Sequence, residues 1–139
     1  MQLSASADYA LRILHYIHVH KGLVRGPNIS EAVGITYPHF QKIAQQLKQH
    51  ELLEAEQGRN GGYRLTRPAQ EISIYDVLSV IQGEMFITRE AQINRNHSQQ
   101  EVTNAIQTYF KGLQAMLINQ MSCTSVADLH VPEAQVLRD

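Results

Sequence analysis

The sequence predicts a mainly α-helical protein with one small β-hairpin, arranged as a winged helix-turn-helix and followed by a long dimerisation helix. Three observations predict this fold class. Two helical patterns flank Gly34, a turn rich in glycine and arginine at residues 58–62 joins two strand-like segments, and an apolar stripe recurs at helical spacing further along. The expected parts are a winged helix-turn-helix DNA-binding domain over 1–83, a linker loop over 84–98, a dimerisation helix over 99–121 and a C-terminal tail over 122–139.

Length and composition place the chain among folded proteins of ordinary make-up. Its 139 residues fit one domain, or one domain with an oligomerisation element. It is 43% hydrophobic and 18% charged, and no apolar run approaches the ~18 residues that a membrane span needs. The N-terminus lacks the basic and apolar regions of a signal peptide, so we expect a cytoplasmic protein without a membrane partner. A lone cysteine, Cys123, excludes an intrachain disulfide.

The charge is distributed unevenly along the chain. The net charge is −1, but residues 37–67 hold five Lys and Arg against three Asp and Glu. This mild local excess is compatible with a phosphate-binding face, and it is weak evidence by itself.

The first helix is predicted over residues 5–20, where apolar side chains recur at helical spacing. Asp8 lies near its N-terminal end, where the helix dipole favours a carboxylate. Gly22 and the pair Gly26-Pro27 are expected to end this helix and to open a turn.

The next two segments predict a helix-turn-helix. Asn28 or Ser30 is expected to cap a short helix, and Gly34 is expected to stop it. Pro38 suits the first turn of the following helix, because its missing N–H costs nothing there. That third helix is expected to continue to about His50. Its predicted buried stripe consists of Phe40, Ile43, Ala44 and Leu47.

The outer face of this third helix carries the polar side chains that DNA reading requires. The major groove of B-DNA admits one helix, and its base edges offer hydrogen-bond donors and acceptors. Gln can pair with adenine through two hydrogen bonds, and Lys can approach guanine or phosphate. The candidates for groove contact are Tyr37, His39, Gln41, Lys42, Gln45 and Gln46, and Lys48 is a candidate for phosphate. The positions nearest the N-terminal end of the helix are favoured for base contacts.

A basic hairpin, or wing, is predicted directly after this helix. Strands are expected over 52–57 and 63–66, and the turn between them holds three glycines, which reach backbone angles that other residues adopt at a cost. Arg59 and Arg64 bracket the turn. Arg59 and Asn60 suit a minor groove or the DNA backbone, because narrow grooves attract arginine. Arg64 is a further DNA-binding candidate.

A fourth helix and a long fifth helix are predicted beyond the wing. The fourth is expected over 74–82, started near Ser73 and stopped at Gly83. The linker shows no clean periodicity, and the tail shows little pattern. The dimerisation stripe of the fifth helix is expected to comprise Val102, Ile106, Tyr109, Phe110, Leu113, Leu117 and Met121.

Parts of the sequence are also compatible with functions other than DNA binding. A winged helix can instead be a protein-interaction module, and Cys123 is the only thiol that could sense oxidants. His15 and His18 lie three residues apart, but metal binding needs more than two imidazoles, so no metal site is expected. The Gly-rich turn lacks the Lys-Ser/Thr ending of a phosphate-binding loop. The sequence shows no arrangement of residues typical of a catalytic site, so we do not expect an enzyme.

At these residues the chain resembles the Rrf-two family of bacterial winged-helix transcriptional regulators, which includes IscR-, NsrR- and CymR-type proteins. The matching motifs are Asp8-Tyr9-Ala10-Leu11-Arg12, Gly58 to Leu65, Arg67-Pro68, Glu71-Ile72, Ile74-Tyr75-Asp76-Val77 and Gly83. The resemblance implies a homodimer in which each winged helix reads half of an inverted repeat in double-stranded DNA, usually as a repressor. The controlling signal, a small ligand or a protein co-regulator, stays open.

One departure from the family pattern concerns the cofactor. Cluster-binding members carry three cysteines between the fourth helix and the dimerisation helix. Residues 84–98 contain none here, and Cys123 lies beyond the dimerisation helix. Because thiolates hold iron–sulfur clusters, we expect a regulator of the cluster-free kind, with no cofactor.

Overall fold

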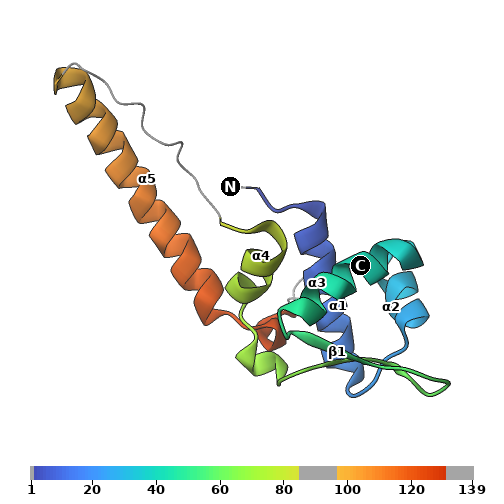
Figure 1. Cartoon of the computed structure of the whole chain (residues 1–139). Helices are drawn as coiled ribbons and strands as arrows, with labels where there is room; N and C mark the ends of the chain where they lie inside the picture. The colour runs from blue at the N-terminus through green and yellow to red at the C-terminus, as the bar shows by residue number, and fades with distance from the viewer. Residues whose placement is uncertain (1, 85–96, 131–139) are drawn as a thin grey trace, which may run out of the picture.

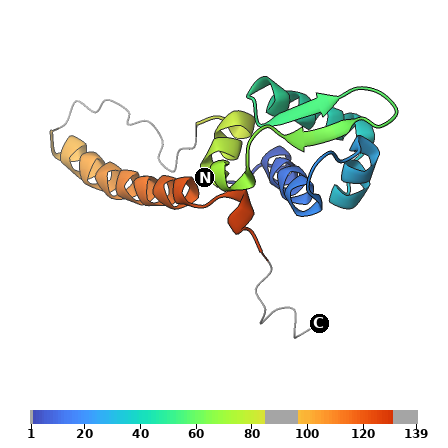
Figure 2. The ribbon, with the colours of Figure 1, turned by 90° about the horizontal axis from the view of Figure 1, so that it is seen from below.

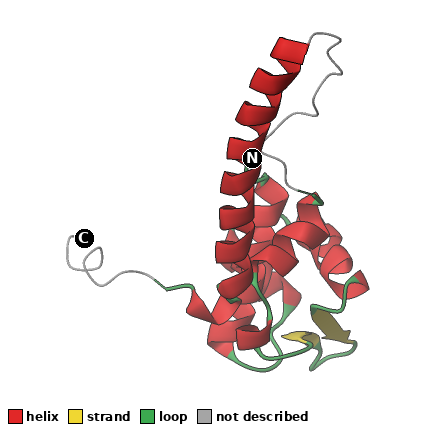
Figure 3. Ribbon diagram, turned by 90° about the vertical axis from the view of Figure 1, so that its left-hand side faces the viewer, coloured by secondary structure: helices red, strands yellow, loops and turns green. Residues whose placement is uncertain are grey.

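A computed structural model describes residues 2–84 and 97–130 of the chain. Figure 1 shows a helical body with a hairpin, from which one long helix extends. The elements in chain order are α1 (Ala5–His20), α2 (Gly26–Val33), α3 (Tyr37–Gln49), β1 (Leu53–Glu56), β2 (Gly62–Leu65), the 3₁₀-helix η1 (Ala69–Glu71), α4 (Ile74–Gln82), α5 (His97–Cys123) and the 3₁₀-helix η2 (Val126–Asp128). The mainly helical class with one hairpin, predicted from the sequence, is confirmed (Figure 3).

Side-chain caps explain why the helices begin where they do. The Ser4 hydroxyl accepts a hydrogen bond from the Ala7 N–H at 3.1 Å, and Thr36 accepts one from the His39 N–H at 3.3 Å. Ser73 and Asp76 cap α4 reciprocally, each side chain accepting from the other residue's backbone N–H. The predicted bounds of the first and fourth helices are confirmed by α1 and α4.

The start of α2 corrects one prediction. Gly26-Pro27 does not form a turn after α1, because the pair occupies the first turn of α2. Proline is tolerated there because the first N–H groups of a helix lack partners within the helix. Ser30 donates its hydroxyl to the Pro27 carbonyl at 3.1 Å, inside the helix, so it does not act as the N-cap. Gly34 ends α2 at a φ of 84°, as predicted, because glycine adopts this left-handed conformation without strain.

One continuous core joins the helices of the body to the base of the hairpin. Phe40 of α3 belongs to this core with no exposed surface, and the predicted stripe of α3 is wholly buried. Burying an apolar side chain of this size contributes about 1.5–3 kcal/mol to folding. Besides Phe40, the largest fully buried side chains are Ile13, Leu14, Ile17, Ile29, Ile43, Leu47, Leu52, Leu53, Ile72, Val77 and Val126.

The wing is an antiparallel pair in which Glu54 lies opposite Arg64. At its tip Gly58 has a φ of 106°, and a Cβ on Gly61 would lie 2.2 Å from the Glu56 carbonyl oxygen. A third segment also pairs with the hairpin, and the periodicity of the sequence did not predict this pairing. Val24, just before α2, exchanges two backbone hydrogen bonds with Tyr63, at 2.8 and 2.7 Å, and this pairing attaches the wing to the start of the helix-turn-helix.

The C-terminal segment corrects a second prediction. The expected tail is partly structured, because η2 follows α5 directly and Val126 is wholly buried in the main core. The Val126 N–H donates to the Ile72 carbonyl at 2.8 Å, and the Ile74 N–H donates to the Thr124 carbonyl at 2.9 Å. These bonds connect the base of α5 to the body that contains α1 to α4. Most of the predicted linker, and residues 131–139, lie outside the described residues.

Seen from below, α5 extends to one side of the body, and the hairpin lies at the opposite side (Figure 2). α5 begins at His97 and ends at Cys123, two residues beyond each predicted end. Among the described helices, none combines the length and the hydropathy required to cross a lipid bilayer.

Candidate nucleic-acid interface

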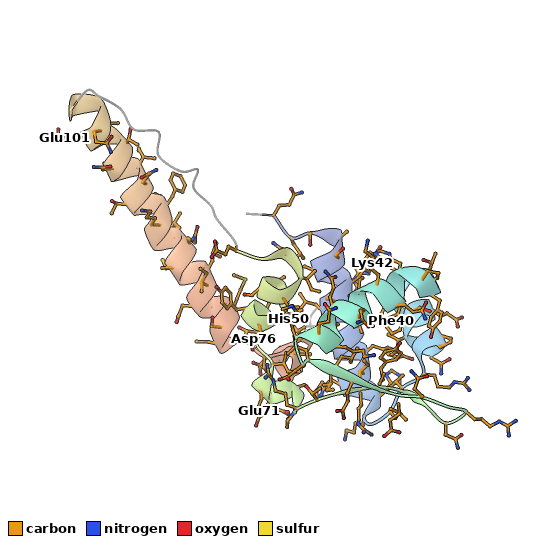
Figure 4. The ribbon with its side chains drawn as sticks, in the orientation of Figure 1. Phe40, Lys42, His50, Glu71, Asp76 and Glu101 are labelled. Carbon is orange, nitrogen blue, oxygen red and sulfur yellow. The ribbon has the colours of Figure 1, made fainter. Side chains whose placement is uncertain are left out.

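The outer face of α3 presents a compact set of polar side chains. Gln41, Lys42 and Gln45 are all exposed, and they lie on the opposite side of the helix from the buried stripe. Figure 4 shows Lys42 and buried Phe40 on different sides of α3. Lys48 is also exposed, near the C-terminal end of the helix. This face therefore offers amide and ammonium groups that can hydrogen-bond base edges or phosphates.

Two of the predicted groove residues lie on the flank of this face. His39 is half-buried, and its ring packs edge-on against Tyr9 of α1, with the ring centroids 5.6 Å apart. Gln46, one helical turn from Lys42, is also half-buried. These two side chains border the exposed face, and the contact of His39 also holds α3 against α1.

An aromatic cluster joins α3 to the wing. Tyr37 stacks on Phe40 with ring centroids 5.9 Å apart, and Phe40 meets Tyr63 of β2 edge-on at 5.1 Å. The rings of Tyr37 and Tyr63 both lie against Gly26, at the start of α2. Burial, and then the neighbouring Tyr37, raise the pKa of Tyr63 above its ordinary value. Tyr37 thus has a structural part in positioning the wing, in addition to its exposed place at the start of α3.

The three DNA-contact residues predicted in the wing lie in two different places. Arg59 and Asn60 are exposed in the turn between β1 and β2. Arg64 lies within β2, where its guanidinium pairs with Glu54 at 2.5 Å and with Glu56 at 2.8 Å. The hydrogen bond that Arg64 donates to Glu54, and then the charge of Glu56, raise the pKa of Arg64. Arg64 therefore neutralises two carboxylates on its own hairpin.

Between the wing, α3 and the start of α2 lies a hollow of about 330 Å³. Gln41, a predicted site residue, lines it together with Arg25 and Gln57, which sequence reasoning missed. Arg25 directly precedes the Gly-Pro start of α2, in a segment that was expected to be only a turn. Its place beside the wing follows from the pairing of Val24 with Tyr63.

The predicted dimerisation stripe of α5 is largely exposed on this single chain. Val102 is 65% exposed, Tyr109 64% and Ile106 56%, with Phe110 and Leu117 at 37% and 41%. Leu113 is half-buried, and Met121 packs against the small cluster of Ala7 and Leu78. Large apolar side chains gathered on one side of a helix are typical of a surface that binds a partner.

The remaining candidates each lie beside a polar group of this chain. Asp8 pairs with Arg12 at 3.0 Å, and the Nε2 of His15 lies 3.2 Å from the Leu129 carbonyl oxygen. Cys123 is exposed, with its Sγ 4.0 Å from the Asn119 Oδ1. Within residues 2–84 and 97–130, no three His, Cys, Asp or Glu side chains are grouped so that they could hold a metal ion.

Comparison with known proteins decides the family. The sequence profile of Rrf2, described as an iron-dependent transcriptional regulator, matches residues 3–132. The chain belongs to the Rrf2 family. This agrees with the resemblance carried by the first helix and the wing, and it makes the chain a DNA-binding transcriptional regulator.

Several relatives share this family's sequence. A Mycobacterium tuberculosis protein, named as a candidate HTH-type transcriptional regulator, is 30% identical over 131 residues, which cover 93% of this chain and 81% of the relative. Protein aau3 of Rhizobium meliloti is 42% identical over 81 residues, covering 58% of this chain and only about half (53%) of that protein. NsrR of Shouchella clausii is 37% identical over 81 residues, covering 56% of this chain and 54% of NsrR.

Solved structures confirm the winged-helix fold of an Rrf2 protein. T. potens IscR superposes with a TM-score of 0.69 at 18% identity, over 92% of this chain and 85% of IscR. CymR of B. subtilis, titled a global cysteine regulator, also gives 0.69 at 18% identity, over 92% of this chain and 95% of CymR.

The donor set of this Rrf2 chain does not fit an iron–sulfur cluster. Clusters are held by thiolates, and the segment 84–98 contains no cysteine. The single thiol, Cys123, is at the end of α5 and has no second cysteine to join it. The family is described as iron-dependent, but this sequence lacks the thiolates that would hold an iron–sulfur cluster.

Proposed function

We propose that the protein is a homodimeric repressor in which each winged helix reads one half of an inverted-repeat operator. The observation that carries this proposal is the exposed polar face of α3 beside a wing whose turn presents Arg59, in a chain of the Rrf2 family. A helix of this kind fits the major groove, and a wing placed beside it reaches an adjacent part of the duplex.

The exposure of each side chain supports a division of roles. Gln41, Lys42 and Gln45 contact base edges, because they are exposed and face away from the core. Arg59 and Asn60 enter the minor groove, where arginine is attracted by the negative potential. Lys48 contacts a phosphate. Arg64 contributes indirectly by neutralising Glu54 and Glu56, which would otherwise repel DNA.

Dimerisation places the two reading helices relative to each other. The exposed stripe of α5 pairs with the same stripe of a second copy, because burying Val102, Ile106 and Phe110 removes apolar surface from water. A two-fold pair presents its reading helices about 34 Å apart, or a multiple of this distance, which corresponds to whole turns of DNA. The operator is then an inverted repeat.

The test begins with selection of binding sequences from a random pool of DNA duplexes by the full chain. Binding of the enriched duplex should weaken steeply with salt, because Lys and Arg displace counterions from phosphates. Lys42→Ala and Arg59→Ala should each lose about 1–3 kcal/mol of binding free energy without loss of folding. Lys111→Ala is the matched control, since Lys111 is exposed on α5, away from the winged helix. Salt-independent binding, or full affinity of the Lys42→Ala, Arg59→Ala double variant, would refute DNA reading and favour a protein-interaction module.

We further propose that this repressor responds to a signal other than an iron–sulfur cluster, such as a small ligand or a protein co-regulator. Anaerobic reconstitution with iron and sulfide should leave the protein colourless, for want of thiolates. Stoichiometric iron and sulfide with a cluster absorbance band would overturn this. Sensing through Cys123 predicts instead that an oxidant changes operator affinity in the wild type but not in Cys123→Ser.

A further inference from the structure

The hollow between the wing and the helix-turn-helix has a polar lining that core packing does not explain. Arg25, Tyr37, Gln41 and Gln57 all border it, from the segment before α2, from α3 and from the wing. All four are exposed residues. The hollow therefore holds hydrogen-bond donors that converge from three parts of the chain that are far apart in sequence.

The Tyr37 hydroxyl is a donor for this hollow, because the Tyr37 side chain lines it and a phenol O–H can donate one hydrogen bond. Tyr63 lines the same hollow. Burial, and then the neighbouring Tyr37, raise the pKa of Tyr63, so Tyr63 stays neutral beside a bound anion.

Close packing holds the two rings in place. A Cβ on Gly26 would lie 2.9 Å from Cε2 and 3.1 Å from the hydroxyl oxygen of Tyr37, and 3.1 Å from Cε2 of Tyr63. Only a glycine leaves room for both rings at this point. Phe40 supports them from the core side. The position of the Tyr37 hydroxyl is therefore fixed before any ligand arrives, which lowers the entropic cost of binding.

The charge of the hollow suits an anion. Arg25 makes no ion pair with any described residue, so its guanidinium is available. Glu56 also borders the hollow, but its carboxylate is paired with Arg64 at 2.8 Å. The guanidinium of Arg25 and the hydroxyl of Tyr37, which packing holds in place, thus face a space in which the neighbouring carboxylate is already neutralised.

We propose that this hollow binds one phosphate of the DNA backbone, with the Tyr37 hydroxyl and the Arg25 guanidinium as its donors. The inference rests on the proposed DNA reading. When α3 occupies the major groove and the wing occupies the neighbouring minor groove, one DNA strand separates them, and its sugar-phosphate backbone must pass between the two elements. Tyr37 then acts as a phosphate contact and not as the base contact expected from its place at the start of α3, and Tyr63 is a positioning residue.

The test uses the duplex enriched by wild-type selection, in which one phosphate at a time is replaced by an uncharged methylphosphonate. At one position in each half-site, wild-type affinity should fall about tenfold, because a hydrogen bond to a charged group is lost. Tyr37→Phe should bind the unmodified duplex about tenfold more weakly than wild type. A methylphosphonate at that position should then reduce the affinity of Tyr37→Phe only a little further. Arg25→Ala should reduce the salt slope by about one. Tyr63→Phe should weaken binding less than Tyr37→Phe, and Tyr16→Phe, on α1, is the matched control.

The outcomes separate this inference from the function on which it rests. If Gln41→Ala loses affinity while Tyr37→Phe and Arg25→Ala bind every duplex like wild type, the phosphate site is wrong and DNA reading stands. A change of base preference in Tyr37→Phe, with no position-specific methylphosphonate effect, would make Tyr37 a base contact and overturn the inference. If the wild type enriches no duplex, the proposed function fails and the phosphate site fails with it. Arg25 is exposed, so its variant tests the site without affecting the core.

Discussion

Helices α3 and α5 are both amphipathic, but the apolar face of α3 is buried within the chain and that of α5 is exposed. The apolar stripe of α3 is buried by the same chain, with Phe40 and Leu47 at 0% exposure, and its polar face remains outside. The stripe of α5 stays outside, with Val102 at 65% exposure. A face that the chain buries contributes to folding, whereas a face left exposed contributes only when another surface covers it.

This difference in burial indicates which function each helix can perform. α3 is held rigidly on its inner side, so its outer side can present fixed groups to DNA. α5 contacts α4, and the segment directly after its C-terminal end is hydrogen-bonded to Ile72 and Ile74 of the body. Its free face therefore suits assembly, and its base can transmit the geometry of that assembly to the winged helix.

The contrast predicts its largest effect at Phe40. Phe40→Ala leaves a cavity in the main core and should lower the free energy of unfolding by about 3–5 kcal/mol. Denaturant unfolding followed by circular dichroism measures this. Phe110→Ala removes the same atoms from a surface that is already partly exposed, and should cost much less in a dilute, monomeric sample. Equal costs for the two variants would contradict the assignment of the two faces.

The second prediction tests the exposed face of α5. Phe110→Asp with Leu117→Asp would bury unpaired charge in a dimer interface, which is strongly unfavourable. The double variant should be a monomer by light scattering and should bind the operator at least about 100-fold more weakly, a loss of roughly 3 kcal/mol. Its winged helix should keep native circular dichroism.

A matched control for this pair uses the polar side of the same helix. Asn104→Asp with Lys111→Asp also adds two carboxylates to α5, at exposed positions away from the apolar stripe. This variant should remain dimeric. A monomeric wild type at micromolar concentration, or an unchanged mass in the Phe110, Leu117 variant, would contradict dimerisation through α5.

The parts of the fold that the sequence predicts are those whose signals are local. Ser73 caps α4 through its nearest neighbours in the chain, Gly34 supplies a left-handed stop for α2, and Pro38 fits the first turn of α3. Each signal lies within a few residues of the structure that it produces. The third and fourth helices were placed to within a residue or so for this reason.

Contacts between distant segments account for what the sequence did not predict. The pairing of Val24 with Tyr63 and the burial of Val126 join residues with no periodic pattern around them. The ion pairs of Arg64 follow from the hairpin register, in which Glu54 lies directly opposite. Counting back from the Gly-rich turn would have found this pair, whereas Arg25 could be placed beside the wing only through the Val24 contact.

The third prediction concerns the junction between the two regions. Val126→Ala removes two methyl groups from a fully buried position and should lower the free energy of unfolding by about 2 kcal/mol. Because Val126 joins the base of α5 to the core, operator affinity should fall even at protein concentrations where the dimer persists. Ala127→Gly, at the neighbouring half-buried position, is a control for backbone effects. An unaltered melting temperature in Val126→Ala would show that η2 does not stabilise the body.

The smallest expected effect is a pH dependence at the same junction. The Asp128 carboxylate accepts a hydrogen bond from the Ser125 backbone N–H at 2.8 Å. This bond, and then the Ser125 side chain, lower the pKa of Asp128 below its ordinary value. A carboxyl group with a lowered pKa in the folded state stabilises the fold above its unfolded pKa, and this contribution is lost as pH falls below about 4.

Asp128→Asn removes this titration from the junction. At pH 7 the variant should be slightly less stable than wild type, and the difference should shrink as pH falls towards 3, where the wild-type carboxyl group is protonated. Melting temperatures measured across that range test the prediction, with Glu31→Gln, at an exposed site on α2, as the control. A difference that stays constant from pH 7 to pH 3 would show that the Asp128 charge does not hold η2 in place, and that burial of Val126 alone fixes the base of α5.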